Sequence, residues 1–185
     1  TTTTTTTTAT TTATTATATS TPSLAARFAA LSKARLGALV VASTMASFAV
    51  AAPINAATLA PFLLTSVGTG LAVASANSIN QMLEVSNDRR MRRTEQRPLV
   101  RGLLSMPAAG AFALGCGLLG PALIALGGSE LAASLALGNI VLYTAVYTPL
   151  KQRSTANTWV GAVVGAVPPL IGWVGAASAL GGEAA

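Results

Sequence analysis

Residues 36–83 read LGALVVASTMASFAVAAPINAATLAPFLLTSVGTGLAVASANSINQML, and no side chain in this run is charged. A helix that crosses a membrane needs about 20 mainly apolar residues, so the run is long enough for two such helices. The sequence Pro53-Ile-Asn55 is the natural break between them, because proline ends helices and asparagine favours turns. The run therefore predicts two membrane-spanning helices, at about 36–53 and 60–84.

Three further stretches lack charge, residues 102–129, 131–150 and 154–182. They predict helices at about 104–127, 131–150 and 158–181. Their alanines and glycines suit close helix packing inside a bundle. The expected fold class is therefore all-α, a polytopic transmembrane bundle with five spans within residues 32–185.

Composition excludes several classes of protein. Only 9% of the residues are charged and 51% are hydrophobic, with a mean hydropathy of +0.61, whereas a water-soluble domain is about 25% charged. The chain has no histidine, so it offers no histidine metal site and no serine–histidine–aspartate triad. Its single cysteine, Cys116, excludes an internal disulfide and is expected to pack as a small apolar residue.

The charges are distributed unevenly about the expected helices. If the five helices alternate in direction, all eleven lysines and arginines fall on one side of the membrane, and only Glu130 and Glu183 on the other. The positive-inside rule then places the basic side toward the cytoplasm or the mitochondrial matrix. We expect an integral protein of the mitochondrial inner membrane with its basic loops in the matrix; a bacterial plasma membrane is the alternative.

The chain begins with a tract of low complexity. Residues 1–21 contain 16 threonines, four alanines and one serine, with no large apolar side chain. Such a composition cannot offset the entropy of ordering, so residues 1–31 are expected to be a disordered Thr/Ala-rich segment. Its lack of acidic residues also fits the remains of a transit peptide.

Asn80, Glu84 and Asp88 are spaced four residues apart at the end of the second helix. At 3.6 residues per turn they form one stripe about 12 Å long. Amide and carboxylate oxygens suit Mg²⁺, which is commonly shared with phosphate oxygens, so the stripe predicts a metal–diphosphate site. The alternative is a solvated helix end whose acids pair with nearby arginines.

The loop that follows carries six arginines, and guanidinium groups match phosphate geometry. We expect Arg89, Arg90 and Arg92 to contact anionic lipid head groups and to set topology. Arg93, Arg97 and Arg101 lie beside the acidic stripe and are candidate diphosphate ligands. The loop has no aromatic residue, which argues against binding to nucleic acid.

The last two expected helices contribute further candidates. Tyr147 and Lys151, four residues apart, end on the same side as the acidic stripe; the alternative is an interfacial tyrosine and a snorkelling lysine. In the final helix, Gly161 and Gly165 predict a close packing face, and the pair at 168–169 predicts a kink or a break. Asn157 is expected to cap that helix or to reach the site.

Five motifs occur in order within about residues 33–175: Ser32-Lys-Ala-Arg35-Leu36, Asn80-Gln-x-x-Glu84-x-x-x-Asp88, Met91-x-Arg93-Thr94-x-x-Arg97-Pro98-Leu-Val-Arg101-Gly102, Tyr147-Thr-Pro-Leu-Lys151 and Ala156-Asn-Thr-Trp159-Val-Gly-Ala-Val-Val-Gly165-Ala-Val-Pro168-Pro169. Together they resemble the UbiA superfamily of intramembrane prenyltransferases, most closely its haem-farnesylating branch. The glutamate at position 84, where many relatives carry aspartate, resembles the mitochondrial form.

This resemblance implies transfer of a farnesyl group from farnesyl diphosphate to a vinyl group of protohaem IX, giving haem O, with Mg²⁺ as cofactor. It implies that the stripe at 80, 84 and 88 is the first of two acidic motifs. The implied diphosphate ligands are Arg93, Arg97, Arg101 and Lys151, assisted by Arg35 and Tyr147.

The sequence departs from the superfamily in one respect. Members have about nine helices and a second acidic motif, but after Lys151 this chain offers only Glu183. We therefore expect it to correspond to the N-terminal half of such an enzyme and to be inactive alone. Two other functions stay open: prenyl transfer to a quinone or another tetrapyrrole, and a non-catalytic role as a membrane carrier or assembly factor.

Overall fold

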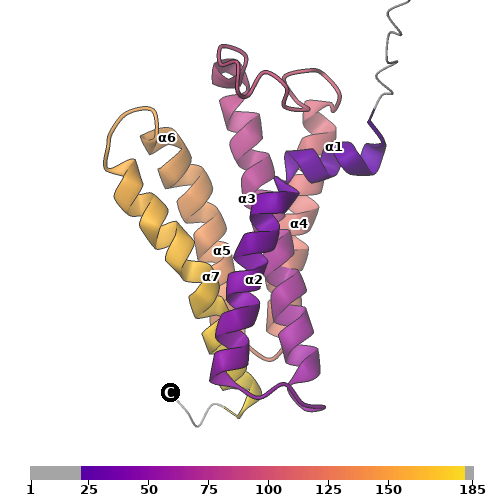
Figure 1. Cartoon of the computed structure of the whole chain (residues 1–185), viewed down its shortest axis with the longest axis vertical. Helices are drawn as coiled ribbons and strands as arrows, with labels where there is room; N and C mark the ends of the chain where they lie inside the picture. The colour runs from indigo at the N-terminus through magenta and orange to yellow at the C-terminus, as the bar shows by residue number, and fades with distance from the viewer. Residues whose placement is uncertain (1–21, 182–185) are drawn as a thin grey trace, which may run out of the picture.

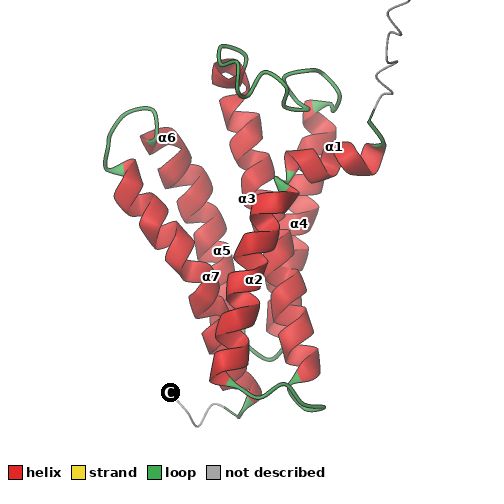
Figure 2. Ribbon diagram, viewed as in Figure 1, coloured by secondary structure: helices red, strands yellow, loops and turns green. Residues whose placement is uncertain are grey.

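The computed structural model describes residues 22–181, and within them every regular element is a helix (Figure 2). The elements, in chain order, are α1 (Leu24–Leu31), α2 (Ala34–Ala51), α3 (Leu59–Asp88), α4 (Met106–Leu126), α5 (Glu130–Val141), the π-helical η1 (Leu142–Tyr147), α6 (Thr148–Leu150) and α7 (Asn157–Ala179). Because α5, η1 and α6 run on without a break, the described residues contain five helices long and apolar enough to span a membrane. The expected all-α bundle of five spans is confirmed.

The N-terminal boundary of the ordered part differs from the prediction. Residues 24–31, expected to be disordered, form the helix α1, which lies across the upright helices (Figure 1). Ser23 caps it by accepting a hydrogen bond from the Ala26 amide, and Leu31 is fully buried against α4 and the loop before it. The free energy gained by burying Leu31 offsets the entropy lost when residues 24–31 become ordered, a loss that composition alone suggested would keep them disordered. The threonine-rich residues 1–21 and Glu183 lie outside the described residues.

Helices α3 and α4 meet at a pair of glycines. A Cβ atom on Gly68 would lie 2.6 Å from the carbonyl oxygen of Gly120, and one on Gly120 would lie 2.7 Å from that of Gly68. Both distances are shorter than real Cβ contacts, so any larger side chain at either position would push the helices apart. This contact fixes α3, the helix that carries the acidic stripe, against its neighbour.

The close contact of α7 with α2 is made at a glycine other than the predicted ones. A Cβ on Gly172 would lie 2.1 Å from the Thr44 carbonyl oxygen of α2. A Cβ on Gly161 would instead meet the Tyr147 ring at 3.0 Å, and one on Gly165 would meet nothing within 4 Å. The predicted close packing is therefore confirmed at Gly161, which faces η1, and wrong at Gly165, because spacing alone does not tell which small residues face a neighbouring helix.

The two prolines do not break α7, which is continuous from Asn157 to Ala179. Pro168 cannot donate to the carbonyl of Val164, but the Asn139 side-chain amide donates to that oxygen at 3.3 Å. The hydroxyl of Thr44 donates to the Pro168 carbonyl at 3.1 Å. The predicted break is wrong because side chains of α5 and α2 satisfy backbone groups along this stretch.

Candidate active site

The last three turns of α3 carry a buried polar face. Asn80, Glu84 and Asp88 are 1%, 4% and 1% exposed, and all three lie at the end of the bundle where the basic loops gather. Buried carboxylates are stable only when they are paired or hydrogen-bonded. The chain therefore has to bring cations to this face.

Three cations reach the stripe, each from a different segment. Lys33 Nζ, at the start of α2, donates to Asn80 Oδ1 at 3.0 Å. Lys151 Nζ, at the end of α6, donates to Glu84 Oε1 at 3.1 Å. Arg97 contacts Glu84 Oε2 at 3.5 Å and forms a charge-assisted hydrogen bond with Asp88 Oδ2. Three positive charges thus face two negative ones, and the excess suits a further anion.

The loop between α3 and α4 turns Arg97 inward. Thr94 donates its hydroxyl to the Asp88 carbonyl at 3.1 Å, and Pro98 and Leu99 are buried. These contacts fold the loop back over the end of α3. The Arg97 side chain, which lies between them in the sequence, therefore points at the carboxylates of Glu84 and Asp88. The neighbouring arginines do not follow it: Arg93 and Arg101 are exposed and contact no charged side chain within residues 22–181.

The remaining candidates from the sequence fall outside the ionic cluster, which we define as Lys33, Asn80, Glu84, Asp88, Arg97 and Lys151. Arg35 is exposed, as are the three arginines expected to face lipid, Arg89, Arg90 and Arg92. Tyr147 stacks on Tyr143 with the ring centroids 5.2 Å apart and makes no side-chain hydrogen bond within the described residues. Asn157 begins α7.

Sequence reasoning missed two members of this network. Lys33 belongs to the first of the five motifs, but its contact with the stripe could not be predicted, because the residue adopts a left-handed backbone conformation with φ of 53°. Burial and, to a smaller extent, the positive charge of Arg97 lower the pKa of Lys33 to about 8. Thr148 accepts a hydrogen bond from the Asn80 amide at 3.1 Å and donates to the Tyr143 carbonyl, which ties the stripe to the π-helical turn.

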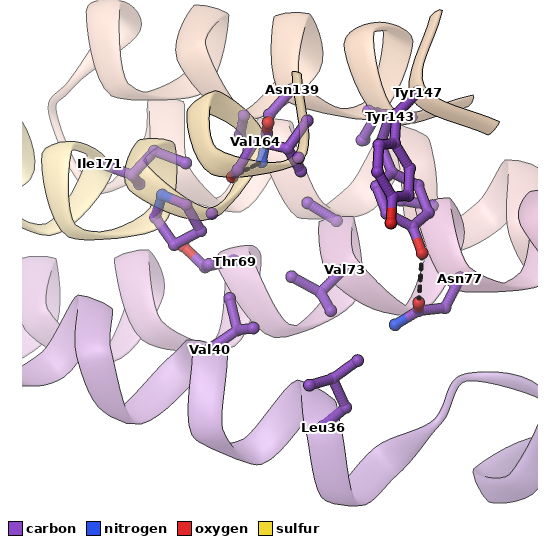
Figure 3. Close-up of a pocket in the computed structure, with 17 residues that line it drawn as sticks. Leu36, Val40, Thr69, Val73, Asn77, Asn139, Tyr143, Tyr147, Val164 and Ile171 are labelled. Atoms are coloured by element: carbon purple, nitrogen blue, oxygen red, sulfur yellow. Dashed lines mark hydrogen bonds between the residues drawn. The ribbon is translucent and has the colours of Figure 1, made fainter. Parts of the chain in front are cut away.

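An apolar cavity of about 260 Å³ lies beside the cluster, between α2, α3, α5, η1 and α7. Figure 3 shows Asn77, Tyr143 and Tyr147 together at one end, and Thr69 and Ile171 toward the other. The Tyr143 hydroxyl donates to Asn77 Oδ1 at 3.4 Å. Since Asn77 lies one turn before Asn80, the polar end of the cavity adjoins the cluster. A cavity with one polar end suits an apolar chain with a charged head.

The donor set of the cluster is made of oxygens. Within residues 22–181, no group of three or more histidine, cysteine, aspartate and glutamate side chains is arranged to hold a metal ion. The stripe instead combines one amide with two carboxylates, and Asp88 Oδ1 is buried without a hydrogen-bond partner in the described part of the chain. Oxygens of this kind fit Mg²⁺, which keeps part of its water shell.

Comparison with known proteins agrees with this geometry. The sequence model of the UbiA prenyltransferase family matches residues 39–185. The chain is 54% identical over 160 residues to the human protein named protoheme IX farnesyltransferase, mitochondrial, covering 86% of this chain and 35% of the relative. It is 49% identical over 146 residues to the protein of that name from Arabidopsis thaliana, covering 79% and 34%, and 45% identical over 160 residues to that from Neurospora crassa, covering 80% and 31%.

The chain thus spans about a third of the length of these curated relatives. No solved structure matches it. Five long apolar helices and the matched family together make the chain an integral membrane protein. On the family match, which extends over most of its length, this chain belongs to the UbiA prenyltransferase family.

Proposed function

We propose that this chain supplies the diphosphate-binding part of an enzyme that transfers the farnesyl group of farnesyl diphosphate to a vinyl group of protohaem IX. The observation that carries the proposal is the ionic cluster at the polar end of an apolar cavity. The names of its relatives, each a protoheme IX farnesyltransferase, support this substrate pair over a quinone acceptor.

The chemistry requires that negative charge be stabilised. The bond between the first farnesyl carbon and the diphosphate oxygen breaks, and its electron pair leaves with the diphosphate. The vinyl group attacks the farnesyl carbon, and water then adds to the haem-side carbon with loss of a proton, giving the hydroxyethylfarnesyl product. Lys33, Arg97 and Lys151 would neutralise the departing diphosphate, which is the largest electrostatic task in the reaction.

Mg²⁺ is part of this proposal. The oxygens of Asn80, Glu84 and Asp88 would hold it, with the unpartnered Asp88 Oδ1 as a ready ligand. The ion would supply additional positive charge against the diphosphate. The two carboxylates hold Arg97 and Lys151 in this structure, so a bound diphosphate would take their place as the partner of these two cations.

The farnesyl chain would lie in the apolar cavity. The stacked rings of Tyr143 and Tyr147 line the cavity at the end that holds Asn77 (Figure 3). We place the farnesyl carbon, on which positive charge develops, at this end. The faces of aromatic rings attract cations. We further propose the mitochondrial inner membrane as the location, with the basic end in the matrix, since the relatives carry mitochondrial names.

A chimera tests the proposed reaction. Residues 22–181 replace the matched segment of the human relative, and the product is identified by mass spectrometry after incubation in liposomes with farnesyl diphosphate, haem and Mg²⁺. We expect haem to gain one farnesyl group and one hydroxyl group, and Glu84→Ala to lower the rate at least 100-fold, as expected for loss of a transition-state contact. The full 185-residue chain, assayed beside it, is expected to form no product alone.

The result also separates the alternatives. Product from the human parent but none from the chimera would overturn the proposal. Prenylation of an added quinone in place of haem would favour the second acceptor class. If Glu84→Ala and Asp88→Ala both leave the chimera's function intact, a carrier or assembly role would replace the enzymatic one.

A further inference from the structure

The two residues that join α1 to α2 form an unusual elbow. Ser32 ends α1 in a helical conformation, and Lys33 follows with φ of 53°. Lys33 is the only residue other than glycine with positive φ in the described part of the chain. A side chain such as lysine rarely adopts this conformation, so surrounding contacts have to hold it there.

Two buried amides on α3 make those contacts. Gln81 Nε2 donates to the carbonyl oxygens of Ala30 at 3.0 Å and Leu31 at 2.7 Å. Asn77 Nδ2 donates to the carbonyl oxygen of Ser32 at 3.0 Å. The acceptors are the consecutive carbonyls of residues 30–32 at the end of α1, where a helix satisfies few of its own carbonyls; that of Ala30 also accepts a longer hydrogen bond from the Lys33 amide at 3.4 Å. The amides therefore hold the backbone that leads into Lys33.

The same face of α3 receives the side chain that the elbow delivers. Asn77, Asn80 and Gln81 lie three and four residues apart, so they share one side of the helix. Lys33 Nζ donates to Asn80 Oδ1 at 3.0 Å, and all three amide residues are at most 4% exposed. Gln81 also leaves its own Oε1 without a partner within residues 22–181, so its burial cost is met through the amide nitrogen alone.

The helix before the elbow is anchored as well. Leu31 packs with Leu99 and Leu104 of the loop that carries Arg97, and the Phe28 ring lies 4.8 Å from that of Phe112. The Arg27 guanidinium donates to the Leu103 carbonyl at 3.1 Å. The elbow and the arginine loop therefore rest on one another, and both deliver a cation to the same cluster.

We propose that Asn77 and Gln81 are positioning residues, whose amides hold the α1–α2 elbow so that Lys33 is presented to the cluster as a third cation for the diphosphate. The inference rests on the proposed function, because it assigns Lys33 to the same ligand. This positioning role differs from simple capping of α1. If the amides only capped α1, their loss would loosen that helix but would not change ligand binding through Lys33.

A double-mutant cycle in the full chain, reconstituted in nanodiscs, tests the proposal. The variants are Gln81→Met, Lys33→Met and both together, with Gln152→Met as a matched control at an exposed glutamine. The affinity for farnesyl diphosphate with Mg²⁺ is measured by calorimetry. We expect each single variant to weaken binding about tenfold, as for loss of one charge-assisted hydrogen bond, and the double variant to be no weaker than Lys33→Met. Gln152→Met is expected to bind as the unchanged protein does.

Hydrogen exchange of residues 31–37 gives a readout independent of ligand. It should be faster in Gln81→Met than in the unchanged protein. If Gln81→Met does not fold, Gln81→Asn, which keeps the amide on a shorter side chain, should show the same two changes. Additive losses of affinity, or an unchanged affinity in Gln81→Met, would overturn the positioning role. If the unchanged protein does not bind farnesyl diphosphate, the proposed function is overturned. If hydrogen exchange of residues 31–37 is the same in Gln81→Met as in the unchanged protein, only the claim that Gln81 holds the elbow is overturned.

Discussion

The arginines of the loop between α3 and α4 face two environments. The Arg97 side chain is 20% exposed and contacts two buried carboxylates. Arg93 and Arg101, four residues before and after it, are exposed and pair with no charged side chain within residues 22–181. The interaction energy of a charge pair increases with burial, because a desolvated pair is screened far less than a pair in water. Burial, and not the number of arginines in the loop, therefore selects the arginine that pairs with the two carboxylates.

The largest effect is expected from Arg97→Met. Removing this guanidinium leaves Asp88 buried without its cation and Glu84 with only Lys151. Breaking a buried pair costs about 3–5 kcal/mol. Thermal unfolding in detergent, followed by circular dichroism, should show this loss of stability, and farnesyl diphosphate binding should fall below detection.

Arg93→Met is the matched control, since it makes the same substitution four residues earlier in the same loop. Its unfolding temperature should stay close to that of the unchanged protein. Equal destabilisation by both variants would show that the loop depends on its total charge, and the distinction between the two environments would fail.

Lys151→Met should have an intermediate effect. Its side chain is 40% exposed, so its pair with Glu84 is partly screened and contributes at most about 1 kcal/mol to stability. Its contribution to ligand binding should be larger, because a bound diphosphate is a stronger anion than a paired carboxylate. We expect affinity for farnesyl diphosphate, measured by calorimetry, to fall about tenfold, with most of it retained in Lys151→Arg. An unchanged affinity in Lys151→Met would remove this lysine from the site.

Sequence patterns predicted the helices and the stripe better than they predicted the cations. Long uncharged runs identify spans, and a spacing of four places Asn80, Glu84 and Asp88 on one face, because both follow from helix geometry alone. Which arginine turns inward depends on the Thr94 hydrogen bond and the burial of Leu99, and spacing within an irregular loop does not encode these. The packing glycine Gly172 was missed for a similar reason, since its partner is the backbone of a distant helix.

Lys33 lay beyond the reach of sequence patterns for a conformational reason. Left-handed backbone is expected at glycine or asparagine, so a lysine between two helices gives no sign that it forms an elbow. The amides that stabilise it come from residues more than forty positions away. The short helix α1 was likewise invisible, because its order depends on Leu31 packing against a loop that follows much later in the chain.

The pH at which Lys33 loses its proton tests whether this side chain is buried in the cluster or exposed like the outer arginines of the loop. Burial and the nearby Arg97 lower its pKa to about 8, so the amine is charged below pH 8 and neutral above it. In the ligand-free protein, the rate of acetylation at Lys33 should therefore rise with an inflection near pH 8. The chain has only two lysines, so mass spectrometry resolves the two sites directly. A rate that is still rising steadily beyond pH 9.5 would place the Lys33 ammonium in water and not in the cluster.

The smallest effects are expected from Arg93→Met and Arg101→Met. Both residues are exposed, and salt at 0.15 M screens exposed charges that are separated by more than about 8 Å. Affinity for farnesyl diphosphate should change by less than about twofold in either variant, because exposed charges contribute little to binding energy in water. The matched motif makes this a demanding test, because the family resemblance assigns both arginines to the diphosphate. A tenfold loss in either variant would mean that the bound ligand draws the loop inward, and exposure in the ligand-free protein would then no longer separate Arg97 from its neighbours.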